Sequence, residues 1–290
     1  MIDVRPLDLS PQGLVDCARL LRSVWPQAAH ITPAYLEWLY CRNPWGRAFG
    51  FNAVDAGRLI VHSPLLPIRG RLCGKPAEGT LSLHSAVDPR HQGKGLFFRI
   101  TRRTYEAARE RGCIFGLGIA NARSTPGFVK LMGFRLLRPL DVRLGFGAIR
   151  YTRTSESEAD FERLWDEDAA RWRLASPTIP YAVSRTANGT LRIEGPSVSP
   201  AIPGVGVIVR EFRGPALSLE PRPPAPPALR PCKLYVGIDP DIEWGRSCYV
   251  PLPMRLRPSP LNLIVKDIQG TGLTVDARHV RIWPLDFDDF

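Results

Sequence analysis

Apolar residues in the first half of the chain recur at spacings that alternate between strand and helix. A short strand at 2–5 is followed by a helix that Ser10 caps, with Leu14, Cys17, Leu20, Leu21 and Val24 on one face. Pro33 opens a second helix that runs to about Cys41. Further elements are predicted as strands at 49–54, 59–66 and 81–87, a helix at 95–111, a strand at 114–119, a helix at 126–132 and strands through 134–147. The two strands around 55–57 flank a turn signal and form a hairpin.

From about residue 150 the pattern changes to mostly strands. One helix is predicted over 159–172, where Phe161, Leu164, Trp165 and Ala169 share a face. Strand-like runs follow at 182–184, 190–193, 205–209, 234–238, 261–265 and 280–283. We therefore expect a mixed α/β (α+β) protein with two domains, at 1–150 and 151–290.

Composition narrows the class of protein. The 290 residues are 44% hydrophobic and 23% charged, which are globular values. No apolar run approaches the ~18 residues of a membrane span, and the first residues lack the pattern of a signal peptide, so we expect a soluble, cytoplasmic protein without a membrane partner. The six cysteines lie far apart without any Cys-x-x-Cys, so neither a metal site nor a disulfide framework is predicted.

The net charge of +11 is unevenly distributed. Residues 1–150 carry 22 Lys and Arg against 10 Asp and Glu, whereas residues 151–290 carry 17 against 18. A basic half beside a neutral one indicates an anionic ligand on the first half, such as a phosphorylated cofactor, a nucleic acid or a membrane surface.

The segment after strand 81–87 has the features of a phosphate-binding turn. Pro89 ends the strand, and Gln92-Gly93-Lys94-Gly95 leads into a helix. Because glycine has no Cβ, consecutive backbone N–H groups can surround an anion, and the helix N-terminus adds about half a positive charge. Neither the Gly-x-x-x-x-Gly-Lys-Ser/Thr loop nor the Gly-x-Gly-x-x-Gly fingerprint occurs here, so a P-loop and a dinucleotide fold are not supported.

Two elements in order identify a family. Val87-x-Pro89-x-x-Gln92-Gly93-Lys94-Gly95 resembles the acyl-CoA loop of the GNAT superfamily of N-acyltransferases, Gln/Arg-x-x-Gly-x-Gly/Ala. Asn121, Ser124 and then Lys130-Leu131-Met132-Gly133-Phe134 are similar to the family's Asn…Lys-x-Gly-Phe element. The resemblance implies a twisted, mostly antiparallel GNAT-like sheet flanked by helices in 1–150. It also implies a second, degenerate GNAT-like domain in 151–290, which lacks the loop and lines the acceptor cleft.

The resemblance also implies roles for individual residues. The CoA pyrophosphate is expected on the backbone amides of the loop and the start of the helix, which are Gln92, Gly93, Lys94, Gly95, Leu96 and Phe97. The main chain of Val87 is expected to bond the pantetheine arm. Asn121 would orient the pantetheine or the acyl carbonyl, and Ser124 would lie near the departing sulfur.

The sequence departs from the family pattern at three places. Phe97 replaces a small residue, and Phe128 lies where many members have a proton-donating Tyr. Strand 81–87 has no Glu, and its one titratable residue is His84, whose ordinary pKa near ~6.5 suits a base at neutral pH. We therefore predict His84 as the base. A packing role for His84, and Glu78 acting through water, are the alternatives.

The predicted function is transfer of an acetyl or other acyl group from CoA to a primary amine of a small molecule, by direct attack in a ternary complex. No metal is expected, and the protein is expected to be a monomer or a homodimer. One alternative is a Fem-like transferase that takes its group from charged tRNA, which the basic half would suit. Another is a CoA-binding module without catalysis.

Overall fold

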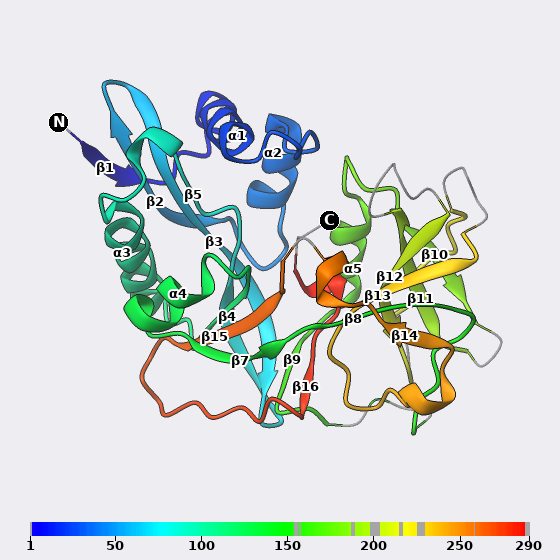
Figure 1. Cartoon of the computed structure of the whole chain (residues 1–290). Coiled ribbons are helices and arrows are strands. Elements are labelled where there is room, and N and C mark those ends of the chain that lie inside the picture. The colour runs from blue at the N-terminus through cyan, green and yellow to red at the C-terminus, as the bar shows by residue number, and fades with distance from the viewer. Residues whose placement is uncertain are drawn as a thin grey trace.

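Two β-sheets, each with helices packed beside it, make up the structure, which is a computed structural model (Figure 1). It describes residues 2–153, 156, 158–186, 189–197, 204–214, 217–224, 230–257 and 259–287. Within these residues the α-helices are α1 (Pro11–Val24), α2 (Pro33–Cys41), α3 (Leu96–Glu110), α4 (Thr125–Met132) and α5 (Glu167–Leu174). No helix among the described residues combines the length and apolar character needed to cross a bilayer.

The first sheet has the order β1-β2-β3-β4-β6-β15-β7, with β5 and β9 also paired to β3, and β16 paired to β9. Its strands are β1 (Asp3–Pro6), β2 (Phe49–Asp55), β3 (Arg58–Leu72), β4 (Lys75–Ser82), β5 (Ala86–Val87), β6 (Phe115–Ala120), β7 (Arg135–Pro139), β9 (Phe161–Arg163), β15 (Asn262–Asp267) and β16 (Val280–Arg281). Neighbouring strands are antiparallel except for the pairs β4–β6 and β9–β16. The predicted mixed α/β fold with a mostly antiparallel sheet is confirmed.

The second sheet has the order β10-β11-β12-β13-β8-β14. Its strands are β8 (Asp141–Phe146), β10 (Ala182–Arg185), β11 (Leu191–Ser197), β12 (Val205–Phe212), β13 (Cys232–Gly237) and β14 (Tyr249–Pro251). Only β12 and β13 run parallel, and the other neighbours are antiparallel. Helix α5 lies beside this sheet (Figure 1).

Helices cover both faces of the first sheet. Two adjacent residues of β3 show this, because neighbouring side chains of a strand point to opposite faces. The ring of His62 lies 3.6 Å from Cys17 of α1, whereas Ser63 bonds Thr101 of α3 at 3.1 Å. Helix α1 therefore lies on one face, together with α2, which packs against it, and α3 lies on the other.

The two sheets exchange strands across the predicted division at residue 150. From the second half, β15 lies between β6 and β7, so it completes the first sheet. From the first half, β8 lies between β13 and β14 in the second sheet. The division into 1–150 and 151–290 stays a prediction about folding units, but the hydrogen bonds of the strands do not follow it.

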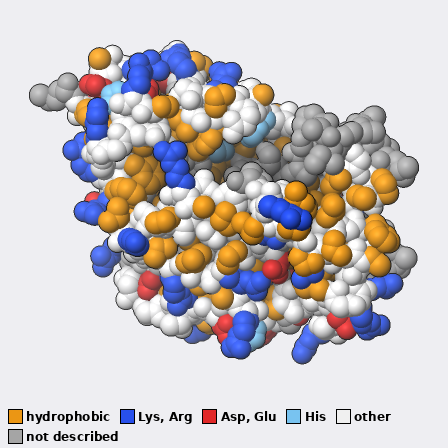
Figure 2. All heavy atoms as spheres, viewed as in Figure 1, with side chains coloured by type: hydrophobic (Ala, Val, Ile, Leu, Met, Phe, Trp, Pro, Cys, Tyr) orange, Lys and Arg blue, Asp and Glu red, His pale blue; other side chains and the backbone are white. Residues whose placement is uncertain are grey.

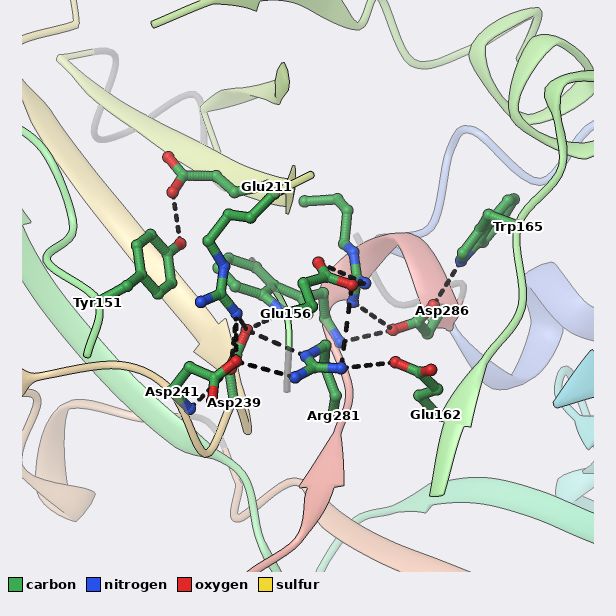
Figure 3. Close-up of polar contacts among 12 residues, drawn as sticks. Tyr151, Glu156, Glu162, Trp165, Glu211, Asp239, Asp241, Arg281 and Asp286 are labelled. Atoms are coloured by element: carbon green, nitrogen blue, oxygen red, sulfur yellow. Dashed lines mark hydrogen bonds and ion pairs between the residues drawn. The ribbon is translucent and has the colours of Figure 1, made fainter. Parts of the chain in front are cut away.

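A buried cluster of charges holds the strands of the second half together (Figure 3). The guanidinium of Arg281 is fully buried and donates to Glu162 at 2.6 Å and to Asp241 at 3.0 Å. Arg213 donates to the same Asp241 carboxylate at 2.8 Å and contacts Asp239 at 3.3 Å. Because buried charges need partners, this cluster fixes how β16, β9 and the segment after β13 meet.

Aromatic residues join α2 to α5. The rings of Trp38 and Trp172 stack with centroids 5.2 Å apart. Each indole N–H donates to the backbone carbonyl of the other residue, at 3.1 Å from Trp38 and 3.3 Å from Trp172. Stacking and paired hydrogen bonds at buried positions make this a specific contact between the two halves.

Two predicted elements are corrected by the structure. The helix predicted over 159–172 is wrong at its start, because 161–163 form β9 and the helix begins at Glu167, with Asp166 as its N-cap. The segment 161–163 is a strand because it pairs with β3. The strand predicted at 81–87 starts earlier, at Lys75, and is interrupted after Ser82.

Candidate active site

The loop before α3 is anchored by a buried carboxylate. Asp88 accepts from the backbone N–H of Arg90 at 3.0 Å and from its guanidinium at 3.0–3.1 Å. The hydrogen bond from the Arg90 side chain is the main reason that the pKa of Asp88 lies well below its usual range, so this carboxylate is ionised. His91 lies 3.8 Å from Asp88 and 3.7 Å from Asp55, which gives it a place in this anchor.

The loop that follows is open where a ligand would approach. Gly93 and Gly95 have φ of +75° and +67°, which favours glycine, and a Cβ built on either would meet nothing within 4 Å. Residues 92–95 are exposed. Gly95 is the N-cap of α3 and gives no side-chain cap, so the N–H groups of the first helical turn point into this open space. An anion can be held there without a change in the backbone.

The side chains of Leu96 and Phe97 pack into the protein, whereas the four residues before them are exposed. The side chain of Leu96 is buried and packs with Ile100, so only its backbone can reach a ligand. The ring of Phe97 packs edge-on against Phe98 and Phe128 at 5.2 and 5.8 Å, between α3 and α4. This large residue therefore fills the space between the helices and leaves the loop amides uncovered.

Two strands separate directly beside this loop. β4 pairs with β6 up to Ser82 and Gly118, after which the chain follows β3 alone through β5. Val87 is paired with Val61 of β3. The other edge of β5 is not bonded to any strand of the described part of the chain. Beyond Gly118, β6 pairs with β15 and no longer with β4. The edge of β5 away from β3 is therefore unpaired within the described residues, and the role of Val87 toward the pantetheine arm stays a prediction.

Asn121 and Ser124 lie together after β6. The side-chain oxygen of Asn121 accepts from the backbone N–H of Ser124 at 2.9 Å and from its hydroxyl at 3.0 Å. Arg123 donates to Gln92 at 3.1 Å, so this turn also contacts the glycine loop. The structure thus brings the residues predicted around the thioester and the pyrophosphate onto adjoining turns. Their roles stay predictions.

His84 occupies a bulge in the strand. Ser82 pairs with Leu65, and Ala86 pairs with His62. The segment 82–86 therefore contains one residue more than the segment 62–65 of β3 that it pairs with, which is a β-bulge. His84 lies at the extra position with φ +50°, a left-handed conformation that is uncommon for residues other than glycine. This backbone turns its half-buried ring toward α2.

Two tyrosines of α2 enclose that ring. The centroids of Tyr35 and Tyr40 both lie 6.0 Å from the His84 ring, and the Tyr40 hydroxyl is 3.0 Å from its Nδ1. Sequence reasoning placed Tyr40 among the aromatic residues of the first helices that could contact substrate, and it did not predict the contact with His84. Glu78, the alternative base, is exposed, pairs with Arg69 at 3.6 Å and lies about 13 Å along the strand from Ser82. It is too distant to assist His84.

Phe128 replaces the tyrosine that many family members have. Its buried ring packs edge-on against Phe97 and Phe134, with centroids 5.8 and 5.1 Å apart. A phenyl ring in this position has no proton to give. In the transfer that the resemblance implies, the proton for the leaving sulfur would therefore come from another group.

Positive charge surrounds the loop and α3. Arg99, Arg102, Arg103 and Arg109 lie on the exposed face of α3, opposite its buried face. In the view of Figure 2, Lys and Arg side chains spread over this half of the molecule with few Asp and Glu between them. Among the described residues, no group of three or more His, Cys, Asp and Glu side chains could hold a metal ion.

Comparison with known proteins identifies the fold. No protein-family model matches the chain, and no curated protein matches it in sequence. A solved GCN5-related N-acetyltransferase from Anabaena variabilis matches with a TM-score of 0.61 at 8% identity, over 92% of this chain and 73% of that one. Eis1 from Mycobacterium abscessus matches with a TM-score of 0.56 at 12% identity, over 93% and 74% of the two chains.

N-myristoyltransferase from Saccharomyces cerevisiae, solved with bound myristoyl-CoA, matches with a TM-score of 0.56 at 8% identity, over 92% of this chain and 82% of that one. Each of these matches extends across both sheets. The predicted GNAT fold is therefore confirmed, and it includes the second half of the chain.

Proposed function

We propose that this protein, which has the GNAT fold, transfers an acyl group from acyl-CoA to a primary amine of a small molecule. The observation that carries the proposal is the open glycine loop at the start of α3, next to the point where the pairing of β4 with β6 ends. Solved proteins of the same fold are N-acyltransferases by name. The residues present fit an acyl-CoA, since uncovered backbone N–H groups suit its pyrophosphate.

In this proposal each predicted site residue has one task. The amides of the loop and of the first turn of α3 bind the pyrophosphate, and Val87 bonds the pantetheine through its main chain. Asn121 orients the thioester, and Ser124 lies beside it. The amine must be neutral to attack, so His84 accepts its proton. The thioester is already activated, so most of the catalytic effect comes from positioning.

The compartment and the acceptor are part of the same proposal. All six cysteines lie in the described part of the chain and are free thiols, which fits the reducing cytoplasm. The aromatic residues of α2 around His84 would border a small amine, since cations and amines bind well to aromatic rings.

Titration calorimetry with CoA and acetyl-CoA tests the proposal. Gly95→Ala places a methyl group in the open space over the loop, and losing one or two charge-assisted hydrogen bonds should weaken CoA binding roughly 10–100-fold. Gly112→Ala is the matched control. Gly112 follows the other end of α3, has φ of +78° and is equally open, so both variants have the same backbone strain. No heat with the unmodified protein, or equal binding by the two variants, would contradict the proposal.

The alternatives are separate outcomes of the same experiments. Binding of tRNA that weakens steeply as salt is raised, without CoA binding, would favour the Fem-like transferase. CoA binding without turnover over a panel of primary amines would favour a non-catalytic binding module.

A further inference from the structure

A chain of hydrogen bonds runs from the interior of the first half to His84. Asn52 Oδ1 lies 2.9 Å from Nδ1 of His62, and Nε2 of His62 lies 3.1 Å from the Tyr40 hydroxyl. The same hydroxyl lies 3.0 Å from Nδ1 of His84. Asn52 and His62 face each other across β2 and β3, so the sheet itself fixes the buried end.

The direction of these bonds follows from the buried end. His62 is fully buried, and burial, with the nearby His84 as a lesser cause, lowers the pKa of its imidazole to about 3, so the ring is neutral and has one N–H. Nδ1 of His62 lies 2.9 Å from Oδ1 of Asn52 and 3.6 Å from Sγ of Cys17. Because an amide oxygen can only accept a hydrogen bond, this contact with Asn52 places the His62 proton on Nδ1.

The remaining bonds follow in sequence. With its proton on Nδ1, His62 accepts at Nε2, so the Tyr40 hydroxyl must donate to it. The oxygen of Tyr40 is then the acceptor for Nδ1–H of His84. In this tautomer the lone pair of His84 is on Nε2, the nitrogen that the Tyr40 bond does not use.

We propose that Tyr40 and His62 are positioning residues that hold His84 as the Nδ1–H tautomer and so make Nε2 the atom that accepts the proton of the attacking amine. The base role of His84 rests on the proposed function, whereas the tautomer does not. The left-handed backbone of His84 fits a positioned side chain, because an uncommon conformation of this kind persists only where surrounding contacts require it. Here the contacts are the bond to Tyr40 and the two tyrosine rings.

The group transfer is balanced with these residues. The nitrogen lone pair of the neutral amine forms the new C–N bond, and the C–S bond breaks with its electron pair on sulfur. The proton leaves the amine for Nε2 of His84 and moves from there to the sulfur, which departs as a thiol. While the imidazole carries both protons, its Nδ1–H remains bonded to Tyr40, whose oxygen stabilises the positive charge. This route brings the sulfur the proton that a tyrosine at position 128 would otherwise donate.

Two-bond ¹H–¹⁵N spectra of the full chain, labelled with [¹⁵N]histidine and recorded at pH 8.5 without ligand, test the assignment directly. These spectra distinguish the two neutral tautomers, and His84→Ala identifies the signals of His84. We expect both His84 and His62 to be protonated at Nδ1. An Nε2–H form of His84 in the unmodified protein would overturn the proposal, whatever any variant does.

Tyr40→Phe tests the role of the hydroxyl. It should remove the preference of His84 for Nδ1–H, and in an acylation assay it should lower kcat tenfold or more, up to the ~10²–10⁴-fold that general acid–base catalysis supplies, with KM for acetyl-CoA unchanged. Tyr249→Phe is the control, because it removes a comparable hydroxyl bond, to Gly147 at 3.0 Å, in the second sheet. Unchanged His84 signals in Tyr40→Phe would refute the role of Tyr40. Absent CoA binding would contradict the proposed function and leave the tautomer result standing.

Discussion

Burial of the His62 imidazole predicts a specific loss of stability in mild acid. The ring lies between α1 and β2, where it contacts Cys17, Asn52 and Tyr40 and is close to His84. Its pKa falls from 6.5 to about 3 in the folded protein, mainly because burial disfavours the charged form. The unfolded chain takes up a proton near pH 6.5, whereas the folded protein does not. Stability is therefore complete above about pH 6.5 and is lost as the pH falls toward 3.

The size of the loss follows from the difference in pKa. Each pH unit of difference corresponds to about 1.4 kcal/mol, so this one group removes up to about 5 kcal/mol of unfolding free energy by pH 3. Between pH 6.5 and 4.5 this group accounts for a loss of about 2–2.5 kcal/mol, and in that window most carboxylates stay ionised in both states. A net stability of ~5–15 kcal/mol makes such a change easy to measure.

Urea unfolding followed by tryptophan fluorescence at several pH values between 7.5 and 4.5 is the assay. His62→Gln should be less stable than the unmodified protein at pH 7.5. Below pH 6 its free energy of unfolding should fall less steeply, and the slopes of the two proteins should differ by about 1.4 kcal/mol per pH unit. His279→Gln, at a mostly exposed position, is the control and should keep the original slope. Equal slopes for His62→Gln and the unmodified protein would refute the reasoning, since a titrating buried imidazole would then not be the cause.

Two further changes test how the halves depend on each other. A fragment of residues 1–150 lacks β15, so the edges of β6 and β7 that face each other are left unpaired. We therefore expect its ¹H–¹⁵N amide spectrum to be poorly dispersed until residues 151–290 are added as a separate chain. A fragment that folds alone would contradict this. Arg281→Ala removes the buried cation that Glu162 and Asp241 share, leaves them only Arg71 and Arg213 as partners, and should cost about 3–5 kcal/mol in urea unfolding. Arg278→Ala, which removes an exposed pair with Asp276, should leave the unfolding midpoint unchanged, and similar effects of the two variants would argue against the cluster.

The parts of the site that depend on local chemistry could be predicted from the sequence. Gly93 and Gly95 have the left-handed backbone that their pattern predicts, and α3 starts directly after them. The hairpin around Ala56 and Gly57 also forms where the turn signal indicated. In each case a few adjacent residues determine the conformation, because glycine adopts such dihedral angles at little steric cost.

The hydrogen-bond chain behind His84 could not be predicted, since it depends on the register of a hairpin. Asp55 pairs with Arg58 and Val54 with Leu59, and unbroken pairing would place Asn52 opposite Val61. A bulge after Ala53 shifts the pairing by one residue and brings His62 opposite Asn52. One extra residue therefore decides whether an imidazole or a valine faces the amide, and no short pattern in the sequence specifies that residue.

Non-local pairing also explains the wrong helix at 159–172. The apolar residues from Phe161 to Ala169 fit a helical spacing, yet 161–163 find unpaired edge groups on β3 and form a strand there. A short segment with an ambiguous pattern takes the structure that its partner offers, and the partner lies about ninety residues earlier in the chain.

The same non-local contacts tie the second half to the predicted site in the first half, although the second half lacks the glycine loop. Helix α2 has only nine residues, too few to be stable alone, and it holds both Tyr35 and Tyr40 against His84. The stack of Trp38 on Trp172 fixes that helix from the other half, while β15 lies beside β6 just before Asn121. In the proposed function, the second half would therefore help to position both the predicted base, His84, and the predicted thioester residues that follow β6.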